Sequence, residues 1–212
     1  MDIENMRRGA ETPAVAGAQD LDGVAADLAA AFTDDAMFDW FLRTDSKRAA
    51  ARLNFFQFIV RNMAFGPGRI ERPATGGAAA IWMPYEWLGP QPLSAELRAL
   101  PTLLRATGFS RFGRLAAMRE DMDKHHPMER KHAYLWFLGV APEAQGHGVG
   151  SRLLKVGTDR CDAAALPAYL ETQTERNVAL YRRHGFEVIS EHRCRADAPL
   201  MWSMWREAQP VE

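Results

Sequence analysis

The segment LGVAPEAQGHGVGSRLL, residues 138–154, carries three glycines between an apolar run and an amphipathic run. Gly146, Gly148 and Gly150 have no side chains, so the backbone there can approach a ligand closely. The segment follows a predicted strand and opens a predicted helix, and consecutive backbone N–H groups at the start of a helix bind anions. The sequence therefore predicts an anion site in this loop, and a pyrophosphate fits it.

Two common phosphate-binding patterns do not fit the loop. A P-loop ends in Gly-Lys-Ser/Thr, but Gly150 is followed by Ser151 with no lysine at the required place. The dinucleotide fingerprint needs a third glycine at the sixth place, which is Ser151 counted from Gly146 and Leu153 counted from Gly148. A nicotinamide-dependent oxidoreductase is thereby disfavoured.

The elements that position the loop follow from hydrophobic spacing. Residues 132–140, HAYLWFLGV, are apolar on both alternating faces, which is typical of a strand buried in mid-sheet, and we expect this strand to be central. The spacing predicts a helix over 148–165, then a short strand, AYLETQ, and a helix over 175–185 that ends at Gly185. FEVISEHRC and LMWSMWRE are predicted to complete the sheet.

The N-terminal half has weaker patterns. We expect a helix behind Asp20, a second helix over 45–65 and a hairpin over 68–84. Residues 86–131 are polar and helical, and we interpret them as two helices inserted beside the sheet. The fold class is therefore α/β or α+β, a sheet covered by helices in a single domain, 1–212.

Composition excludes several classes of protein. Lys and Arg (26) nearly balance Asp and Glu (27), which disfavours a nucleic-acid binder. The N-terminus lacks a signal-peptide core, and no window reaches the roughly 18 apolar residues of a membrane span. We expect a cytoplasmic monomer or homodimer that does not bind membranes. Two cysteines, Cys161 and Cys194, are interpreted as reduced packing residues.

The pattern Gln145-x-x-Gly148-x-Gly150 after a strand ending in V-x-P resembles the GNAT superfamily of N-acetyltransferases. The downstream AYLETQTERNVALYRRHGFE is also similar to that family, with Asn177 and Tyr181 on the helix before a GF strand. HPMERKHAYLWFLGV, LET and MWSMWRE further resemble the puromycin-N-acetyltransferase-like branch. The resemblance covers roughly residues 130–207.

The resemblance implies acetyl transfer from acetyl-CoA to a primary amine by direct attack in a ternary complex. It implies a mixed, mostly antiparallel sheet in which the parallel strands 132–140 and 168–172 splay apart around the cofactor, and an acetyl-CoA-binding half at 132–207. A backbone N–H near Val140 would stabilise the charge on the thioester oxygen. The residues expected to bind the cofactor are Leu138, Gly139, Val140, Gln145, Gly146, His147, Gly148, Val149, Gly150, Ser151, Asn177 and Tyr181.

Acetyl transfer to an amine also needs an acid and a base. An alkylamine with a pKa near 10.4 is protonated at neutral pH, so a base must remove its proton before attack. Glu171 is the first candidate because its strand lines the splay, and His132 and Glu129 are alternatives. Tyr181 is expected to donate a proton or a hydrogen bond to the departing thiolate.

The acceptor pocket is expected to come from the N-terminal helices and the insertion. Aromatic walls with carboxylates suit a cationic, partly apolar amine, so we expect a small-molecule acceptor and not a histone-like tail. The alternatives are a non-catalytic acyl-CoA-binding sensor and a protein or peptide N-acetyltransferase. The candidates are Trp40, Trp82 and Glu86, with Phe38, Asp39, Tyr85 and Trp87 beside them.

Three histidines and one cysteine could suggest other chemistry. His125, His126 and His132 have no carboxylates or thiolates at ligand spacing in the sequence, so we expect hydrogen-bonded histidines and no metal. Cys161 lies on an apolar helix face, where a thiol behaves as a small hydrophobe.

Overall fold

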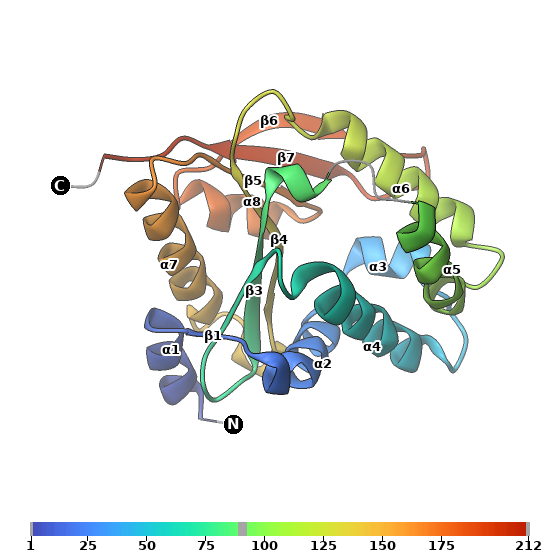
Figure 1. Cartoon of the computed structure of the whole chain (residues 1–212), viewed down its shortest axis with the longest axis horizontal. Helices are drawn as coiled ribbons and strands as arrows, with labels where there is room; N and C mark the ends of the chain where they lie inside the picture. Colours follow the sequence, from blue (N-terminus) through green and yellow to red (C-terminus); the bar gives the residue numbers. More distant parts are fainter. Residues whose placement is uncertain (1, 89–92, 211–212) are drawn as a thin grey trace.

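Seven strands form one sheet in a computed structural model, which describes residues 2–88 and 93–210 (Figure 1). Their order across the sheet is β1-β2-β3-β4-β5-β7-β6. β4 and β5 are parallel, and the other neighbouring strands are antiparallel. The strands are β1 (Ala14–Val15), β2 (Arg69–Arg72), β3 (Ala78–Pro84), β4 (Ala133–Val140), β5 (Ala168–Thr172), β6 (Glu187–His192) and β7 (Met201–Arg206).

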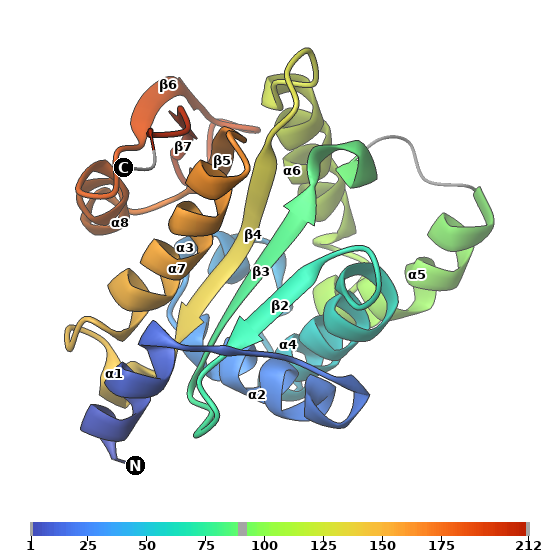
Figure 2. The same ribbon diagram turned by 60° about the vertical axis from the view of Figure 1, so that its left-hand side comes forward.

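Helices cover both faces of the sheet (Figure 2). One face packs against α2 (Leu21–Ala31), α3 (Ala36–Phe41), α4 (Arg48–Phe58), α5 (Leu93–Thr107) and α6 (Phe112–His125). The other face packs against α1 (Ile3–Glu11), α7 (Val149–Ala163) and α8 (Glu175–Arg182). The predicted mixed α/β fold, mostly antiparallel with one parallel pair, is confirmed. We call the two sides the α6 face and the α7 face.

Strict alternation along β3 sends its side chains to opposite faces. Ala79, Ile81 and Met83 contribute to the core of the α6 face. Ala80 and Trp82 contribute to the core of the α7 face. β3 and β4 are buried on both faces because each face carries its own layer of helices, which is why HAYLWFLGV has no polar side.

The parallel pair separates soon after it forms. β4 and β5 pair only at Ala133 with Ala168 and at Tyr134 with Tyr169. The register of β4 against β3 shifts beyond this point, so that Trp136 is an extra residue, a β-bulge. A bulge bends and twists its strand, and here it lies where β4 leaves β5. The predicted splay between these two strands is therefore present.

The predicted elements of the N-terminal half are also found, with local differences. The helix over 45–65 consists of α4 followed by a π-helical segment, η2 (Ile59–Ala64). The predicted hairpin is β2 and β3, and the insertion contains α5 and α6. The predicted insertion includes residues 89–92, which lie outside the described residues.

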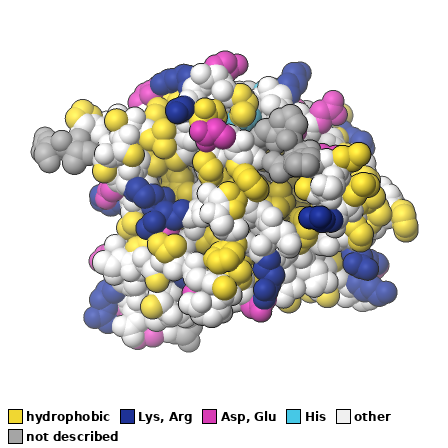
Figure 3. Space-filling view, in the orientation of Figure 1, with side chains coloured by type: hydrophobic (Ala, Val, Ile, Leu, Met, Phe, Trp, Pro, Cys, Tyr) yellow, Lys and Arg dark blue, Asp and Glu magenta, His cyan; other side chains and the backbone are white. Residues whose placement is uncertain are grey.

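Two features complete the outer parts of the molecule. α1, which the hydrophobic spacing did not predict, packs on α7. Exposed Leu93, Leu97 and Phe109 belong to the α5–α6 hairpin, the end of the molecule where Figure 3 shows apolar surface at the right.

Neither cysteine is in a disulfide. Among the described residues, no helix has both the length and the apolar composition needed to cross a bilayer.

Candidate active site

The glycine loop connects the end of β4 to the first turn of α7. Gly146 and Gly148 both have φ of +80°, in the left-handed region that favours glycine. The side-chain amide of Gln145 donates to the carbonyl of Val140 at 3.1 Å and folds the loop over the strand end. A Cβ on Gly150 would lie 3.2 Å from Val140 Cγ2, so the first turn of α7 approaches the strand closely. The first N–H groups of α7 have no partner within the helix and face this loop.

Two arginines bring positive charge to the loop. Arg152 donates to the carbonyl of Gly148 at 3.2 Å and to Glu11 of α1 at 2.7 Å. Arg176, in the first turn of α8, has Nη2 at 3.8 Å from the position that a Cβ on Gly146 would take. Backbone donors and two guanidinium groups therefore surround the place where an anion would bind.

The other predicted loop residues differ in what they expose. Leu138 is half-buried and packs on the α7 face, whereas Gly139 faces α2, where a Cβ would lie 2.8 Å from a leucine methyl group. Val149 is buried in the core, so only its backbone can reach a ligand. His147 is exposed. Ser151 Oγ lies 2.7 Å from Nε2 of His184, which follows α8.

Asn177 and Tyr181 lie four residues apart on α8 and share one face of that helix. Tyr181 is buried against Phe186, with ring centroids 5.9 Å apart. Burial raises the pKa of Tyr181 well above its ordinary value, so the phenol stays protonated and able to donate. Asn177 is half-buried one turn earlier.

Glu171 lies on the α6 face of β5, two residues beyond the last paired position of the splay. Its side chain is only 3% exposed, and its Oε1 atom has no hydrogen-bond partner in the described part of the chain. Burial raises the pKa values of Tyr134 and Tyr169, and the negative charge of Glu171 beside them adds to both shifts. A buried carboxylate oxygen without a partner is suited to accept a proton from a bound ligand.

His126 and His132 adjoin this carboxylate. The two Nε2 atoms are 2.8 Å apart, and His132 Nδ1 is 2.7 Å from the carbonyl of Arg130. Burial lowers the pKa of His132 to about 4, so it is neutral at physiological pH. Because a carbonyl only accepts, His132 carries its proton on Nδ1, and His126 donates from Nε2. The Nδ1 atom of His126 lies 3.9 Å from Glu171 Oε1.

The structure separates the three candidate bases. Glu171 is buried beside the splay, His132 is buried and hydrogen-bonded through both nitrogens, and Glu129 is exposed in the loop after α6. A base must have an acceptor atom that no other donor occupies, and among the three candidates Glu171 has a buried one without a hydrogen-bond partner in the described residues.

Two of the three predicted acceptor residues lie on the same side as Glu171. Trp40 is buried on the α6 face and donates from Nε1 to Asp197 at 3.1 Å. Glu86 is exposed, and its charge acts on His132. The adjacent Tyr85 has its ring centroid 5.5 Å from that of His132.

Trp82 lies apart from them, on the α7 face. A Cβ on Gly157 would lie 2.3 Å from its indole ring, and the Arg160 guanidinium lies 5.7 Å from the ring centroid. Trp82 therefore packs beneath α7 and is not brought together with Trp40, because alternation along β3 turns it to the other face. Of the neighbouring candidates, Phe38 is buried, Asp39 exposed and Trp87 half-buried.

The family model described as "Acetyltransferase (GNAT) family" matches residues 107–186. These residues include the splayed strands, the glycine loop, Glu171 and Tyr181. Residues 107–186 are therefore similar to the GNAT acetyltransferase family.

Solved structures support a GNAT-like fold over 92–94% of this chain. A protein from Corynebacterium glutamicum, described as "histone acetyltransferase HPA2 and related acetyltransferase", is 23% identical with a TM-score of 0.69, over 94% of this chain and 98% of that one. A polyamine N-acetyltransferase of Drosophila melanogaster is 15% identical with a TM-score of 0.61, over 92% and 98%. Arylalkylamine N-acetyltransferase 2 of Aedes aegypti is 11% identical with a TM-score of 0.62, over 93% and 98%.

Several residues of this candidate site were not identified from the sequence. Tyr134 and Tyr169 look like ordinary apolar positions of buried strands, and His126 was considered only for metal binding. Arg176 is adjacent to Asn177 and differs from the exposed arginines at the other end of α8 only by its position beside the loop. Burial raises the pKa of Cys161 to about 11, which fits the predicted packing role and disfavours a nucleophile.

Proposed function

We propose that this GNAT acetyltransferase moves an acetyl group from acetyl-CoA to the primary amine of a small molecule, by direct attack in a ternary complex. The observation that carries the proposal is the buried, unpartnered Oε1 atom of Glu171 beside the splay of β4 and β5. Acetyl-CoA supplies an activated thioester when it is bound.

The glycine loop would hold the pyrophosphate of acetyl-CoA. The left-handed Gly146 and Gly148 keep side chains away from the approaching phosphates, and Arg176 and Arg152 supply positive charge. Leu138, Val140, Ser151 and Asn177 would contact the rest of the cofactor from β4, α7 and α8. The backbone N–H near Val140 would donate to the thioester oxygen as negative charge develops there.

Glu171 would act as the general base. Its free oxygen accepts a proton from the ammonium form of the substrate, which leaves a lone pair on the nitrogen for attack. The neutral His132 would hold His126 in place through the hydrogen bond between their Nε2 atoms. His126 would in turn hold the orientation of the Glu171 carboxylate, because its Nδ1 atom lies 3.9 Å from Oε1.

Tyr181 would act as the general acid. The leaving group is a thiolate, and a donor near the sulfur lowers the barrier to its departure. Tyr181 suits this role because burial keeps its phenol protonated, and because α8 follows β5 directly and brings the ring to the α7 face of the splay.

A small cationic amine fits the surroundings of Glu171 better than a peptide chain does. Glu86, Tyr85 and Trp40 supply one carboxylate and two aromatic rings on the same side of the sheet. The polyamine and arylalkylamine acetyltransferases with similar folds carry names that describe small amine acceptors. The likeness to the puromycin-N-acetyltransferase-like branch, the cytoplasmic location and the monomer or homodimer remain predictions.

A panel of amines tests the proposal by measuring CoA release. It contains a polyamine, an arylalkylamine, an aminonucleoside, a peptide with a free N-terminus and a lysine-containing peptide. We expect turnover of at least one small amine. Turnover of peptides alone would favour a protein N-acetyltransferase, and acetyl-CoA binding without turnover of any acceptor would favour an acyl-CoA sensor.

A further inference from the structure

A continuous row of hydrogen bonds crosses the α6 face from the site to the edge of the sheet. Tyr169 of β5 donates to Ser203 Oγ of β7 at 2.9 Å, and Ser203 Oγ lies 3.0 Å from His192 Nε2 of β6. His192 Nδ1 lies 2.5 Å from Asp121 Oδ2 of α6. Glu171 is opposite Ser203 in the register of β5 and β7, so the row begins beside the candidate base.

The donors in this row have one consistent direction. A carboxylate only accepts, so His192 carries a proton on Nδ1 and donates it to Asp121. The Nε2 atom of His192 is then an acceptor and receives the Ser203 hydroxyl proton, while Ser203 Oγ accepts from Tyr169. Every proton along the row therefore points away from Glu171 and toward Asp121.

We propose that Tyr169, Ser203 and His192 form a proton relay that carries the substrate's surplus proton from Glu171 to the Asp121 end of the row. This inference rests on the proposed acetyl transfer. An ammonium substrate loses two protons when it becomes an amide, and the CoA thiolate takes one of them. The net reaction is R–NH3⁺ + CH3CO–SCoA → R–NH–COCH3 + CoASH + H⁺, so one proton must leave the buried site in each turnover.

Each step of the relay breaks one O–H bond and forms a new one, except the last, which forms an N–H bond on His192. Glu171 returns its proton to the Tyr169 oxygen, the Tyr169 proton passes to Ser203, and the Ser203 proton passes to His192 Nε2. His192 becomes an imidazolium, which the Asp121 carboxylate stabilises. The phenol does not need to ionise, because it accepts one proton as it gives up another. The imidazolium then gives its Nδ1 proton to the Asp121 end, from which it leaves to solvent. The row is reset when the two hydroxyl groups rotate and the His192 ring turns over, which brings its remaining proton back to the side of Asp121.

The far end of the row is nearer to solvent than its beginning. The side chain of Glu171 is 3% exposed, whereas those of Asp121 and His125 are 13% and 24% exposed. The groups that face His192 are Asp121 and His125 from α6 and Ser203 from β7. The charge of Asp121 also acts on Cys194, just beyond β6. Asp121 and His125 therefore offer an exit that Glu171 itself does not have.

A second row of hydrogen bonds begins at His126, whose Nδ1 atom lies 3.9 Å from Glu171 Oε1, and this row cannot carry a proton out. It runs through His126 and His132 and ends on the backbone carbonyl of Arg130. A carbonyl cannot accept a proton and release another, so this row positions its members and goes no further. Of the two rows, only the one through Tyr169, Ser203 and His192 can therefore carry the proton.

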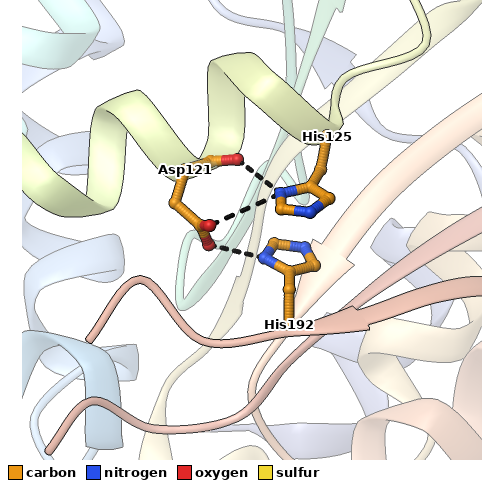
Figure 4. Close-up of side chains that lie close together, drawn as sticks. All are labelled: Asp121, His125 and His192. Atoms are coloured by element: carbon orange, nitrogen blue, oxygen red, sulfur yellow. Dashed lines mark hydrogen bonds and ion pairs between the residues drawn. The ribbon is translucent and has the colours of Figure 1, made fainter. Parts of the chain in front are cut away.

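Asp121, His125 and His192 are close enough together to be compared with a metal site (Figure 4). Their possible ligand atoms lie within 4.8 Å of one another. The two imidazole rings are stacked, with centroids 3.8 Å apart and planes 14° apart. In-plane lone pairs of parallel rings do not converge on one ion, and both Nδ1 atoms already face oxygens of Asp121. This geometry favours hydrogen bonding over metal coordination.

The test is the pH dependence of turnover in His192→Gln. Glutamine can still hydrogen-bond Ser203 but cannot take up a proton, so the fold keeps its polar contacts and the relay stops. The variant then depends on amine that is already neutral in solution, a fraction that rises tenfold per pH unit below the amine's pKa. With an alkylamine acceptor, we expect kcat/KM of the parent to exceed that of the variant at least tenfold at pH 7 and less than threefold at pH 9.

Ser203→Ala is the second variant and should give the same pH-dependent ratio. Tyr134→Phe is the matched control, because it removes a buried phenol that also lies beside Glu171 but has no link to Ser203. Any loss in the control should be the same at both pH values. Melting temperature and acetyl-CoA binding are measured for all three variants.

A ratio that stays constant with pH would overturn the relay, since a structural role weakens the enzyme equally at every pH. Activity of the parent that is lost with a chelator and restored by zinc would also overturn it, in favour of a metal at Asp121, His125 and His192. If the parent acetylates no amine, the proposed function itself fails. These outcomes are distinguishable because the first two require an active parent.

Discussion

The two sides of the splayed strands are built from different chemistry. On the α7 face, the parts that would meet a cofactor are backbone N–H groups, left-handed glycines and one phenol, Tyr181. On the α6 face, the same strands present the carboxylate of Glu171 and two phenols, and the segment between α6 and β4 adds two imidazoles, all of them buried. The α7 face suits binding of a constant anionic group, and the α6 face suits proton transfer.

This difference predicts that substitutions on the two faces have different kinetic signatures. A change on the α6 face should lower kcat and leave acetyl-CoA affinity intact, since its groups act on protons. A change in the glycine loop should lower acetyl-CoA affinity, since its groups act on the phosphates.

The largest effect is expected from Glu171→Gln. The amide keeps the size of the side chain but cannot accept the substrate's proton, so kcat should fall about 100- to 10,000-fold. Binding of acetyl-CoA, measured by calorimetry, should change less than threefold. Glu129→Gln is the matched control, because Glu129 was an alternative base and is exposed. A large fall in the control with a small one in Glu171→Gln would exchange their roles.

The same contrast explains what the sequence could predict. The glycine loop is recognisable because its parts, from Gln145 to Gly150, are consecutive and need no knowledge of the fold. Glu171 was predicted because its strand is adjacent to the loop strand in a fold with one parallel pair. The Asp121–His192 contact joins residues 71 apart on a helix and an edge strand, and no local pattern brings them together.

Trp82 shows that the sequence did not predict to which face of the sheet a strand residue points. An aromatic residue near a predicted pocket was assigned to its wall, but the face to which a strand residue points depends on register. In a strand buried on both sides, apolar residues occupy both faces and hydrophobicity does not distinguish them. The contact of Trp82 with Gly157 of α7 is a property of the assembled sheet.

Tyr181→Phe tests the one titratable group of the α7 face that would take part in chemistry. Phenylalanine keeps the ring that packs on Phe186 but removes the donor to the leaving thiolate. We expect kcat to fall about ten- to a thousandfold with nearly unchanged acetyl-CoA binding. A kcat within about twofold of the parent, measured on any accepted amine, would leave Tyr181 with a packing role only.

The glycine loop offers a comparison between charge and shape at Gly148. Asp and Asn both tolerate the left-handed conformation better than most residues, and each would point toward the Arg152 guanidinium. Asp also adds a negative charge where the phosphates approach, and two like charges about 4 Å apart repel by several kcal/mol near a surface. We expect Gly148→Asp to weaken CoA binding about 100-fold, and Gly148→Asn at least tenfold less than that. Equal losses in the two variants, measured by calorimetry, would assign the effect to shape alone.

The smallest expected effect is on the free energy of unfolding. Its pH dependence should change with a histidine of the α6 face, His132, and not with a histidine of the glycine loop, His147. The pKa of His132 is about 4 in the folded chain because of burial, against about 6.5 in the unfolded chain. The unfolded chain therefore binds an extra proton between these values, so the contribution of His132 is fully present above pH 6.5. It is lost at up to about 1.4 kcal/mol per pH unit as the pH falls toward 4.

His132→Gln should remove this part of the pH dependence. The free energy of unfolding, measured by urea denaturation from pH 7.5 to 4.5, should fall less steeply for the variant than for the parent below pH 6.5. Comparing the two slopes matters, because burial also lowers the pKa of His184 and raises those of Asp35 and Asp123, and these groups titrate in both proteins. His147→Gln, in the exposed part of the glycine loop, should leave the slope as it is in the parent. A slope unchanged in His132→Gln would mean that this imidazole takes up a proton as easily in the folded chain as in the unfolded chain. A proton on His132 Nε2 would then make His132 the donor and His126 the acceptor in the hydrogen bond between them.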